Sequence, residues 1–154
     1  MRLAIGPLVS EKTEQHTATV TLTNIAPTAC RLDGYPTITL FDSRGRLLRF
    51  IYSHRGDQMI TGARARSIDL RSRVSAFFAL NKNVCVALTT RFARTLRIAL
   101  PASPASRSIR LPRYPIIDYC PTGDPGATVT VSPIEPSLKD TACLAQGSCR
   151  RRSR

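Results

Sequence analysis

Polar and apolar residues alternate along several short segments of the chain. The clearest is residues 17–23, where threonines alternate with Ala18, Val20 and Leu22. A period of two in a segment rich in β-branched residues predicts a strand with one buried and one solvated face. A second alternating segment, interrupted by turn-forming residues, predicts a β-hairpin over residues 37–52.

Further strands are predicted by similar segments at residues 2–9, 66–70, 74–80, 94–100 and 127–132. No segment combines the apolar spacing of an amphipathic helix with capping residues, so no long helix is expected. Six prolines between Pro101 and Gly126 predict a long extended surface loop, with one edge strand at 116–119. About eight short strands separated by turns are typical of an all-β sandwich or barrel.

The chain of 154 residues has the length of one ordinary domain. We expect a β-sandwich domain over residues 1–136 and a mobile, basic, cysteine-containing tail over residues 137–154, because the alternation stops after Pro136. Apolar residues make up 42%, which is the usage of a folded protein. No stretch approaches the roughly 18 apolar residues of a membrane helix, so no membrane span is expected.

The charge is strongly positive, with 23 Lys and Arg against 10 Asp and Glu, and 20 of the basic residues are Arg. Guanidinium groups bind phosphate and carboxylate with paired hydrogen bonds, which makes an anionic polymer or lipid head groups the candidate ligand. The alternative is a solvated face without a ligand. The candidate anion-binding residues are Arg44, Arg46, Arg49, Arg64, Arg66, Arg71, Arg73, Arg150, Arg151 and Arg152; Arg91, Arg94 and Arg97 follow the second cluster.

Catalytic patterns are missing from the sequence. His16 and His54 are expected at the surface, and no nucleophile-elbow pattern accompanies them. The acidic residues offer no preferred pair, and there is no glycine-rich phosphate loop. We therefore expect no enzyme, no catalytic residue and no cofactor.

The five cysteines are Cys30, Cys85, Cys120, Cys143 and Cys149. Their spacing matches no zinc pattern, so no metal site is expected. In a small β-domain disulfides are the more usual role, and these require an oxidising compartment. The alternative is five reduced cysteines in a cytosolic protein. Because the number is odd, at least one thiol lacks a partner within the chain.

A specific set of residues resembles a known family. The segment Thr23-Asn24 is followed by Cys30, Leu32 and the run Gly34-Tyr35-Pro36, and then by a strand and turn ending at Gly45. In this order they resemble an actinobacterial extracytoplasmic domain of unknown function, the DUF4232-like family of lipoproteins and secreted proteins. The resemblance covers about residues 3–135.

The resemblance implies an immunoglobulin-like sandwich of about seven to nine strands, with no known activity. It also implies a disulfide between Cys85 and Cys120, with Cys143 and Cys149 able to close locally and Cys30 able to compete for either bridge. Family members often carry a further cysteine just before the first strand. It is missing here, which suggests that the true start lies upstream of Met1 and that Cys30 has lost its partner.

From these observations we expect a non-enzymatic β-sandwich that serves as a binding or structural module of the cell envelope or is secreted. Its ligand is unknown and is an anionic polymer if the positive charge is functional. The extracytoplasmic location depends on a start upstream of Met1. The alternative is a cytosolic basic protein that binds nucleic acid through its Arg clusters and Arg-rich tail. Few aromatic residues (6%, no Trp) make nucleic acid the weaker choice, because stacking platforms are scarce.

Overall fold

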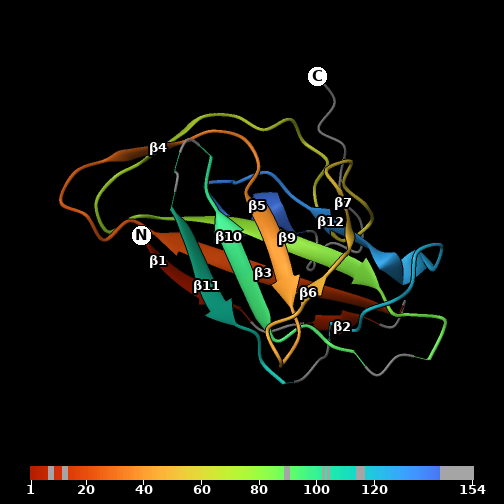
Figure 1. Ribbon diagram of the computed structural model, residues 1–154. Helices are drawn as coiled ribbons and strands as arrows, with labels where there is room; N and C mark the ends of the chain where they lie inside the picture. The colour runs from red at the N-terminus through yellow and green to blue at the C-terminus, as the bar shows by residue number, and fades with distance from the viewer. Residues whose placement is uncertain are drawn as a thin grey trace.

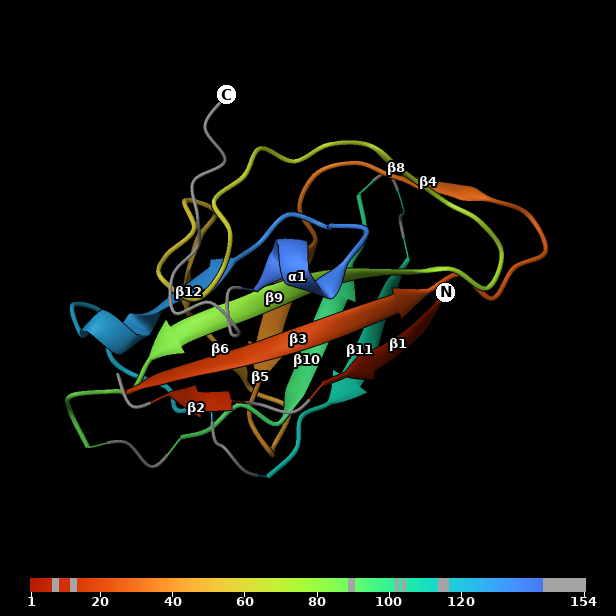
Figure 2. The same ribbon diagram turned by 180° about the vertical axis from the view of Figure 1, so that it is seen from behind.

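The structure is a computed structural model, and it describes residues 1–6, 9–11, 14–88, 91–101, 103, 105–113 and 117–142. Two β-sheets lie face to face and enclose the core (Figure 1), and the view from behind shows the same two layers in the reverse order (Figure 2). The all-β sandwich predicted from the alternation is confirmed.

The larger sheet has six strands, and its longest members are β3 (Gln15–Thr23) and β9 (Ser75–Asn83). These two strands pair antiparallel along their whole length, from Gln15 opposite Asn83 to Thr23 opposite Ser75. The other strands of this sheet are β1 (Arg2–Ile5), β2 (Val9–Glu11), β7 (Ile51–Ser53) and β12 (Thr128–Val131), in the order β1-β3-β9-β12-β7 with β2 also on β3.

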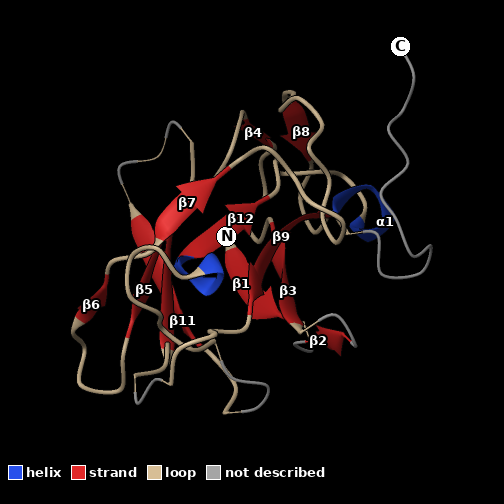
Figure 3. Ribbon diagram, turned by 90° about the vertical axis from the view of Figure 1, so that its right-hand side faces the viewer, coloured by secondary structure: helices blue, strands red, loops and turns tan. Residues whose placement is uncertain are grey.

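The smaller sheet has four strands in the order β11-β10-β5-β6. They are β11 (Ser106–Arg110), β10 (Thr95–Ala99), β5 (Thr37–Phe41) and β6 (Leu47–Leu48). A separate pair joins β4 (Cys30–Leu32) to β8 (Ile68–Leu70). The two helices of the described residues are short: the 3₁₀ turn η1 (Pro125–Ala127) and α1 (Leu138–Thr141), as Figure 3 shows.

The core is filled by the inward-facing apolar residues of both sheets. They include Val20, Leu22, Phe78 and Val129 from the larger sheet and Ile38, Leu40, Leu96 and Ile98 from the smaller one. The side chains of residues 17–23 therefore alternate as predicted, and the aliphatic ones point into the core. Burial of this apolar surface, at about 25 cal/mol per Å², is the main force that holds the two sheets together.

The predicted hairpin over residues 37–52 is only half right. β5 and β6 pair as expected, but only through Leu40–Leu48 and Phe41–Leu47. The chain then leaves this sheet at the buried Phe50, and β7 joins the larger sheet as a parallel partner of β12. Alternation identifies a strand, but it does not identify the neighbour to which the strand hydrogen-bonds.

The predicted loop over residues 101–126 contains a strand that the sequence did not reveal. β11 lies within it and pairs antiparallel with the whole of β10. The edge strand expected at 116–119 is wrong for residues 117–119, where Asp118 makes only an isolated bridge to Phe92. Residue 116 lies outside the described residues. β11 has only one apolar residue, Ile109, so it lacks the alternation that marks a half-buried strand.

Residues 138–142, which the sequence placed in the tail, comprise α1 (Leu138–Thr141) and Ala142, and they pack against the outer face of the larger sheet. Ala142, Ile60 and Ala79 make a second, small apolar cluster there. Figure 2 shows α1 lying over β9. Across the described ranges, no helix is long and apolar enough to cross a membrane.

Candidate functional site

Lys82 and His16 stand at one end of the core-facing side of the larger sheet. The register places them opposite each other, and the next pair on the same side, Ala18 and Leu80, is buried in the core. Because side chains alternate along a strand, the two ionisable groups continue the row of core residues. The Lys82 side chain exposes only 2% of its surface.

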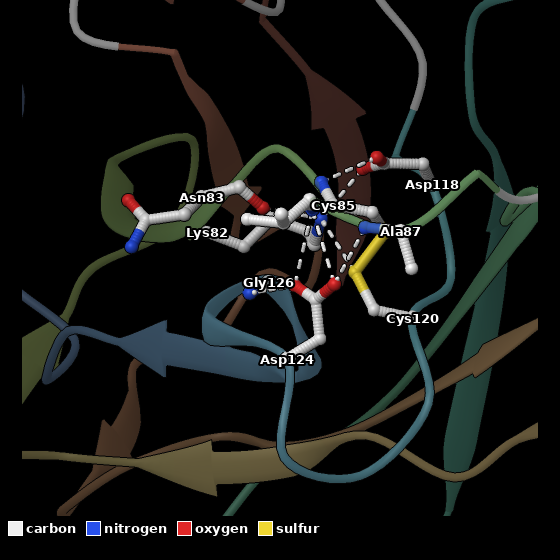
Figure 4. Close-up of polar contacts among 9 residues, drawn as sticks. Lys82, Asn83, Cys85, Ala87, Asp118, Cys120, Asp124 and Gly126 are labelled. Carbon is white, nitrogen blue, oxygen red and sulfur yellow. Dashed lines mark hydrogen bonds and ion pairs between the residues drawn. A yellow bond between two sulfur atoms is a disulfide. The ribbon is translucent and has the colours of Figure 1, made fainter.

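The ammonium group of Lys82 lies close to polar atoms of Asp118, Asn83 and Cys120 (Figure 4). Its Nζ donates to Asp118 Oδ1 at 2.5 Å and to the Asn83 carbonyl at 2.5 Å, and it lies 3.9 Å from Cys120 Sγ. Burial lowers the pKa of Lys82, whereas the hydrogen bond and negative charge of Asp118 act in the opposite direction. A charge this deep is tolerated because a carboxylate accompanies it.

Asp118 also binds the segment that follows β9. Its Oδ2 accepts a hydrogen bond from the Cys85 N–H at 2.8 Å. Cys85 and Cys120 form a disulfide with a Cα–Cα distance of 5.5 Å, which joins positions 35 residues apart. The bridge implied by the family resemblance is therefore present. Among the described residues Cys30 is a free, half-buried thiol, and Cys143 and Cys149 lie outside that part of the chain.

Asp124 fixes the same segment from its other side. Its carboxylate accepts from the N–H groups of Val86 and Ala87, each at 3.0 Å, and from Gly126 N–H at 2.8 Å, which caps η1. These backbone donors, that of Ala87 first, lower the pKa of Asp124. A Cβ at Gly126 would lie 2.5 Å from Cys120 Sγ, so a side chain has no room beneath the disulfide.

His16 is half-buried, which corrects the expectation that it lies at the surface. Its Nδ1 is buried and has no hydrogen-bond partner among the described residues. Burial lowers the pKa of His16; the charge of Asp118 raises it and that of Lys82 lowers it further. His54 is exposed, as expected, and stacks on the Tyr35 ring with centroids 4.1 Å apart.

The cluster around Lys82 suits a structural role. The two cysteine sulfurs and a carboxylate oxygen of Asp118 lie within 4.8 Å of one another. Metals bind cysteine as thiolate, however, and these two sulfurs are bonded to each other. The Lys82 amine is shielded from solvent and hydrogen-bonded. This cluster therefore joins the loop after β9 to the segment before η1.

A polar cavity of about 300 Å³ lies on the opposite, outer face of the larger sheet. Asn81 Nδ2 donates to Gln15 Oε1 at 2.6 Å and to Asp57 Oδ2 at 2.9 Å, and Thr17 Oγ1 donates to Asn81 Oδ1. The cavity is lined by Gln15, Asp57, Gln58, Asn81, Asn83, Pro125, Thr128 and Thr130. Asn81 therefore joins Gln15 and Asp57 by hydrogen bonds within the lining of the cavity.

The arginines singled out in the sequence do not form one surface. Arg44 and Arg46 lie in the β5–β6 turn, whereas Arg71 and Arg73 follow β8, and Figure 1 shows these regions at different ends of the molecule. Arg49 and Arg64 are exposed in loops. Arg150, Arg151 and Arg152 lie outside the described residues.

Two of those arginines are already engaged by carboxylates. Arg46 Nε lies 2.9 Å from Asp42 Oδ2, and Arg66 Nη2 lies 2.8 Å from Oε2 of the buried Glu135. The Asp42 carboxylate also accepts from the Arg46 and Arg44 N–H groups, and the Arg46 N–H is the largest cause of a lowered Asp42 pKa. Both arginines thus contribute to the fold.

A more continuous basic region runs along β10, β11 and the segments that flank them. Residues 91–113 contain six arginines and neither Asp nor Glu. Arg97 is exposed on the outer face of the smaller sheet, with its guanidinium carbon 4.6 Å from the centre of the Phe41 ring. The six are Arg91, Arg94, Arg97, Arg107, Arg110 and Arg113. Only the first three were noted from the sequence, because β11 was not expected.

A family model described as Domain of unknown function (DUF4232) matches residues 3–135. A comparison with curated proteins found no significant match. A comparison with solved structures found none either. The matched region contains both sheets, the disulfide and the basic segment of residues 91–113.

Proposed function

The chain belongs to the DUF4232 family, a domain of unknown function, and we propose that it is a non-enzymatic, extracytoplasmic binding module for polyanions. The observation that carries the proposal is the concentration of arginine at one end of the sandwich. The actinobacterial origin suggested by the resemblance is part of the same proposal.

This region is the basic end, defined here as Arg44, Arg46, Arg91, Arg94, Arg110 and Arg113. Backbone contacts bring its segments together: Arg94 N–H donates to the Phe41 carbonyl at 2.7 Å, and Leu111 N–H donates to the Arg94 carbonyl at 2.9 Å. The Arg94 side chain reaches the Arg113 carbonyl at 3.5 Å. The end of β5, the start of β10 and the end of β11 therefore present their arginines together.

The carboxylates near the basic end do not cancel its charge. Asp42 is shared by Arg46 and Arg91, at 2.9 and 3.7 Å, and Asp118 is paired with Lys82. Arg110 and Arg113 are exposed, and no carboxylate pairs with them among the described residues. Exposed guanidinium groups without a paired carboxylate are suited to binding the phosphate or carboxylate groups of a polymer.

The extracytoplasmic part of the proposal is supported by the Cys85–Cys120 disulfide. Structural disulfides persist in oxidising compartments and are rare in the reducing cytosol. The bridge is packed against Lys82 and Gly126, which fits a structural bond. A structural disulfide is not expected in a cytosolic nucleic-acid-binding protein, because the cytosol keeps thiols reduced.

The test is binding to long-chain inorganic polyphosphate at 50 and 200 mM salt. We expect Arg110→Gln with Arg113→Gln to weaken binding about tenfold and to reduce the slope of log K against log salt by about 1.5, since each lost phosphate contact removes roughly 0.7–0.9. The matched control is Arg64→Gln with Arg71→Gln, which removes the same charge from exposed positions elsewhere and leaves most of the affinity.

Equal losses in the two double variants would show that only net charge matters, and would contradict a site at the basic end. Binding that does not change with salt would contradict an ionic site altogether. Tighter binding to single-stranded nucleic acid than to polyphosphate would favour the cytosolic alternative.

A further inference from the structure

The segment that follows β9 exposes two apolar side chains. Leu88 is fully exposed, at 105% of its reference surface, and Val86 is 82% exposed. Isolated apolar residues on a surface are ordinary. These two lie two positions apart on the same short loop.

The loop is held in place over most of this stretch. Cys85 is fixed by the disulfide and by its N–H bond to Asp118, and the Asp124 carboxylate accepts from the next two N–H groups, those of Val86 and Ala87. The backbone from Cys85 to Ala87, which carries Val86 and directly precedes Leu88, is therefore held by three successive contacts (Figure 4). Ordering the loop in advance lowers the entropy cost of inserting its side chains into a partner.

The loop lies at the basic end. Tyr119 N–H, next to the disulfide, donates to the Arg91 carbonyl at 2.9 Å, and the Arg91 side chain donates to the Leu47 carbonyl at 3.4 Å. Leu47 is itself 47% exposed. Figure 1 shows the segment after β9 and the β5–β6 turn along the same lower edge of the molecule.

We propose that the basic end docks on the surface of an anionic lipid bilayer, with Val86 and Leu88 inserted among the lipid chains and the arginines on the head groups. This proposal rests on the proposed function and names its ligand. A dissolved polyanion offers nothing to an exposed leucine, whereas a bilayer interface offers negative charge and an apolar layer together. Charge complementarity selects the anionic lipid, and the apolar side chains add a contribution that salt does not screen.

The experiment is co-sedimentation with vesicles of phosphatidylglycerol and phosphatidylcholine, in equal parts, at 50 and 200 mM salt. We expect Val86→Ser with Leu88→Ser to weaken vesicle binding about tenfold at both salt concentrations, because two interfacial aliphatic side chains are lost. The matched control is Ile25→Ser with Val74→Ser, which changes exposed aliphatic residues at the other end of β3 and β9. It should bind as the unchanged protein does.

The outcomes separate this inference from the proposed function. If Val86→Ser with Leu88→Ser binds vesicles as tightly as the unchanged protein, while Arg110→Gln with Arg113→Gln still weakens polyphosphate binding, the lipid inference is overturned and the polyanion function stands. Retention of the protein on purely zwitterionic vesicles would also overturn it. If both kinds of variant leave their ligands bound, both proposals fail. Circular dichroism of each variant confirms that it is folded.

Discussion

Lys82 follows the core residues Ala76, Phe78 and Leu80 at the same spacing of two, and its charge is the feature that the alternation does not anticipate. The sequence interpretation ended this strand at residue 80. Extending the alternation by two residues would have flagged a lysine in a core position. Its partner Asp118 lies in a segment without a regular pattern of polar and apolar residues, so the ion pair could not be predicted from the sequence.

Asp118→Asn should destabilise the fold by about 3 kcal/mol, because it leaves the buried Lys82 ammonium without a counter-charge. Lys82→Met combined with Asp118→Asn should recover at least half of that loss, since no uncompensated charge remains. Chemical denaturation followed by circular dichroism measures both. A change of less than about 1 kcal/mol in Asp118→Asn would mean that Lys82 is not held as a charged group.

His16 should make the protein less stable in mild acid. Its pKa in the folded state is lowered from the ordinary 6.5 by burial, so below pH 6.5 the unfolded chain takes up a proton that the folded chain resists. The unfolding free energy therefore falls as the pH drops through this range. Urea denaturation at pH 7.5 and 5.0 should show a smaller fall in His16→Gln than in the unchanged protein.

The exposed His54 supplies the control for that measurement. His54→Gln removes an imidazole that stacks on Tyr35 in a solvent-exposed position, so its fall in unfolding free energy with acid should exceed that of His16→Gln. If the two variants lose the same amount, the acid dependence does not come from the buried imidazole.

At the scale of strands, the sequence predicted which segments pack into the core, but it did not predict which strands hydrogen-bond to each other. β3 and β9 were found within a few residues because aliphatic alternation reports directly on burial. β7 was placed in the wrong sheet and β11 was missed, since neither strand is held mainly by apolar side chains. In both, backbone hydrogen bonds determine the strand: β7 pairs with β12, a segment distant in the chain, and β11 pairs with β10, the strand just before it.

The disulfide between the loop after β9 and the segment before η1 should contribute about 3–4 kcal/mol to stability, as expected for a loop of this length. Cys85→Ser with Cys120→Ser measures that contribution by denaturation. In protein purified from its native host, alkylation before reduction should label Cys30 and leave Cys85 and Cys120 untouched. Cys30→Ser is the control for the labelled site.

Free thiols at Cys85 and Cys120 in that native protein would argue against an oxidising compartment. The cytosolic alternative would then be the better account, and the proposed location would be withdrawn.

Over the whole molecule, composition predicts the amount of charge and the fold decides its distribution. The formal charge of +13 could be counted from the chain, but the sequence clusters around Arg44 and Arg71 separate in the folded protein. The basic end is assembled from three segments that meet through backbone hydrogen bonds. The arginines of residues 91–113 are already close in the chain, but the β5–β6 turn comes next to them only when β5 pairs with β10.

The parallel pairing of β7 with β12 has a consequence for the timing of folding. Ile51 lies opposite Thr128, so β7 has no partner in the larger sheet until most of the domain has been synthesised. Until that point a nascent chain emerging from the ribosome exposes the apolar face of an incomplete sandwich. Strand pairs so distant in sequence form slowly, and such intermediates are prone to aggregate. The larger sheet can therefore be completed only after residues 128–131 have been synthesised.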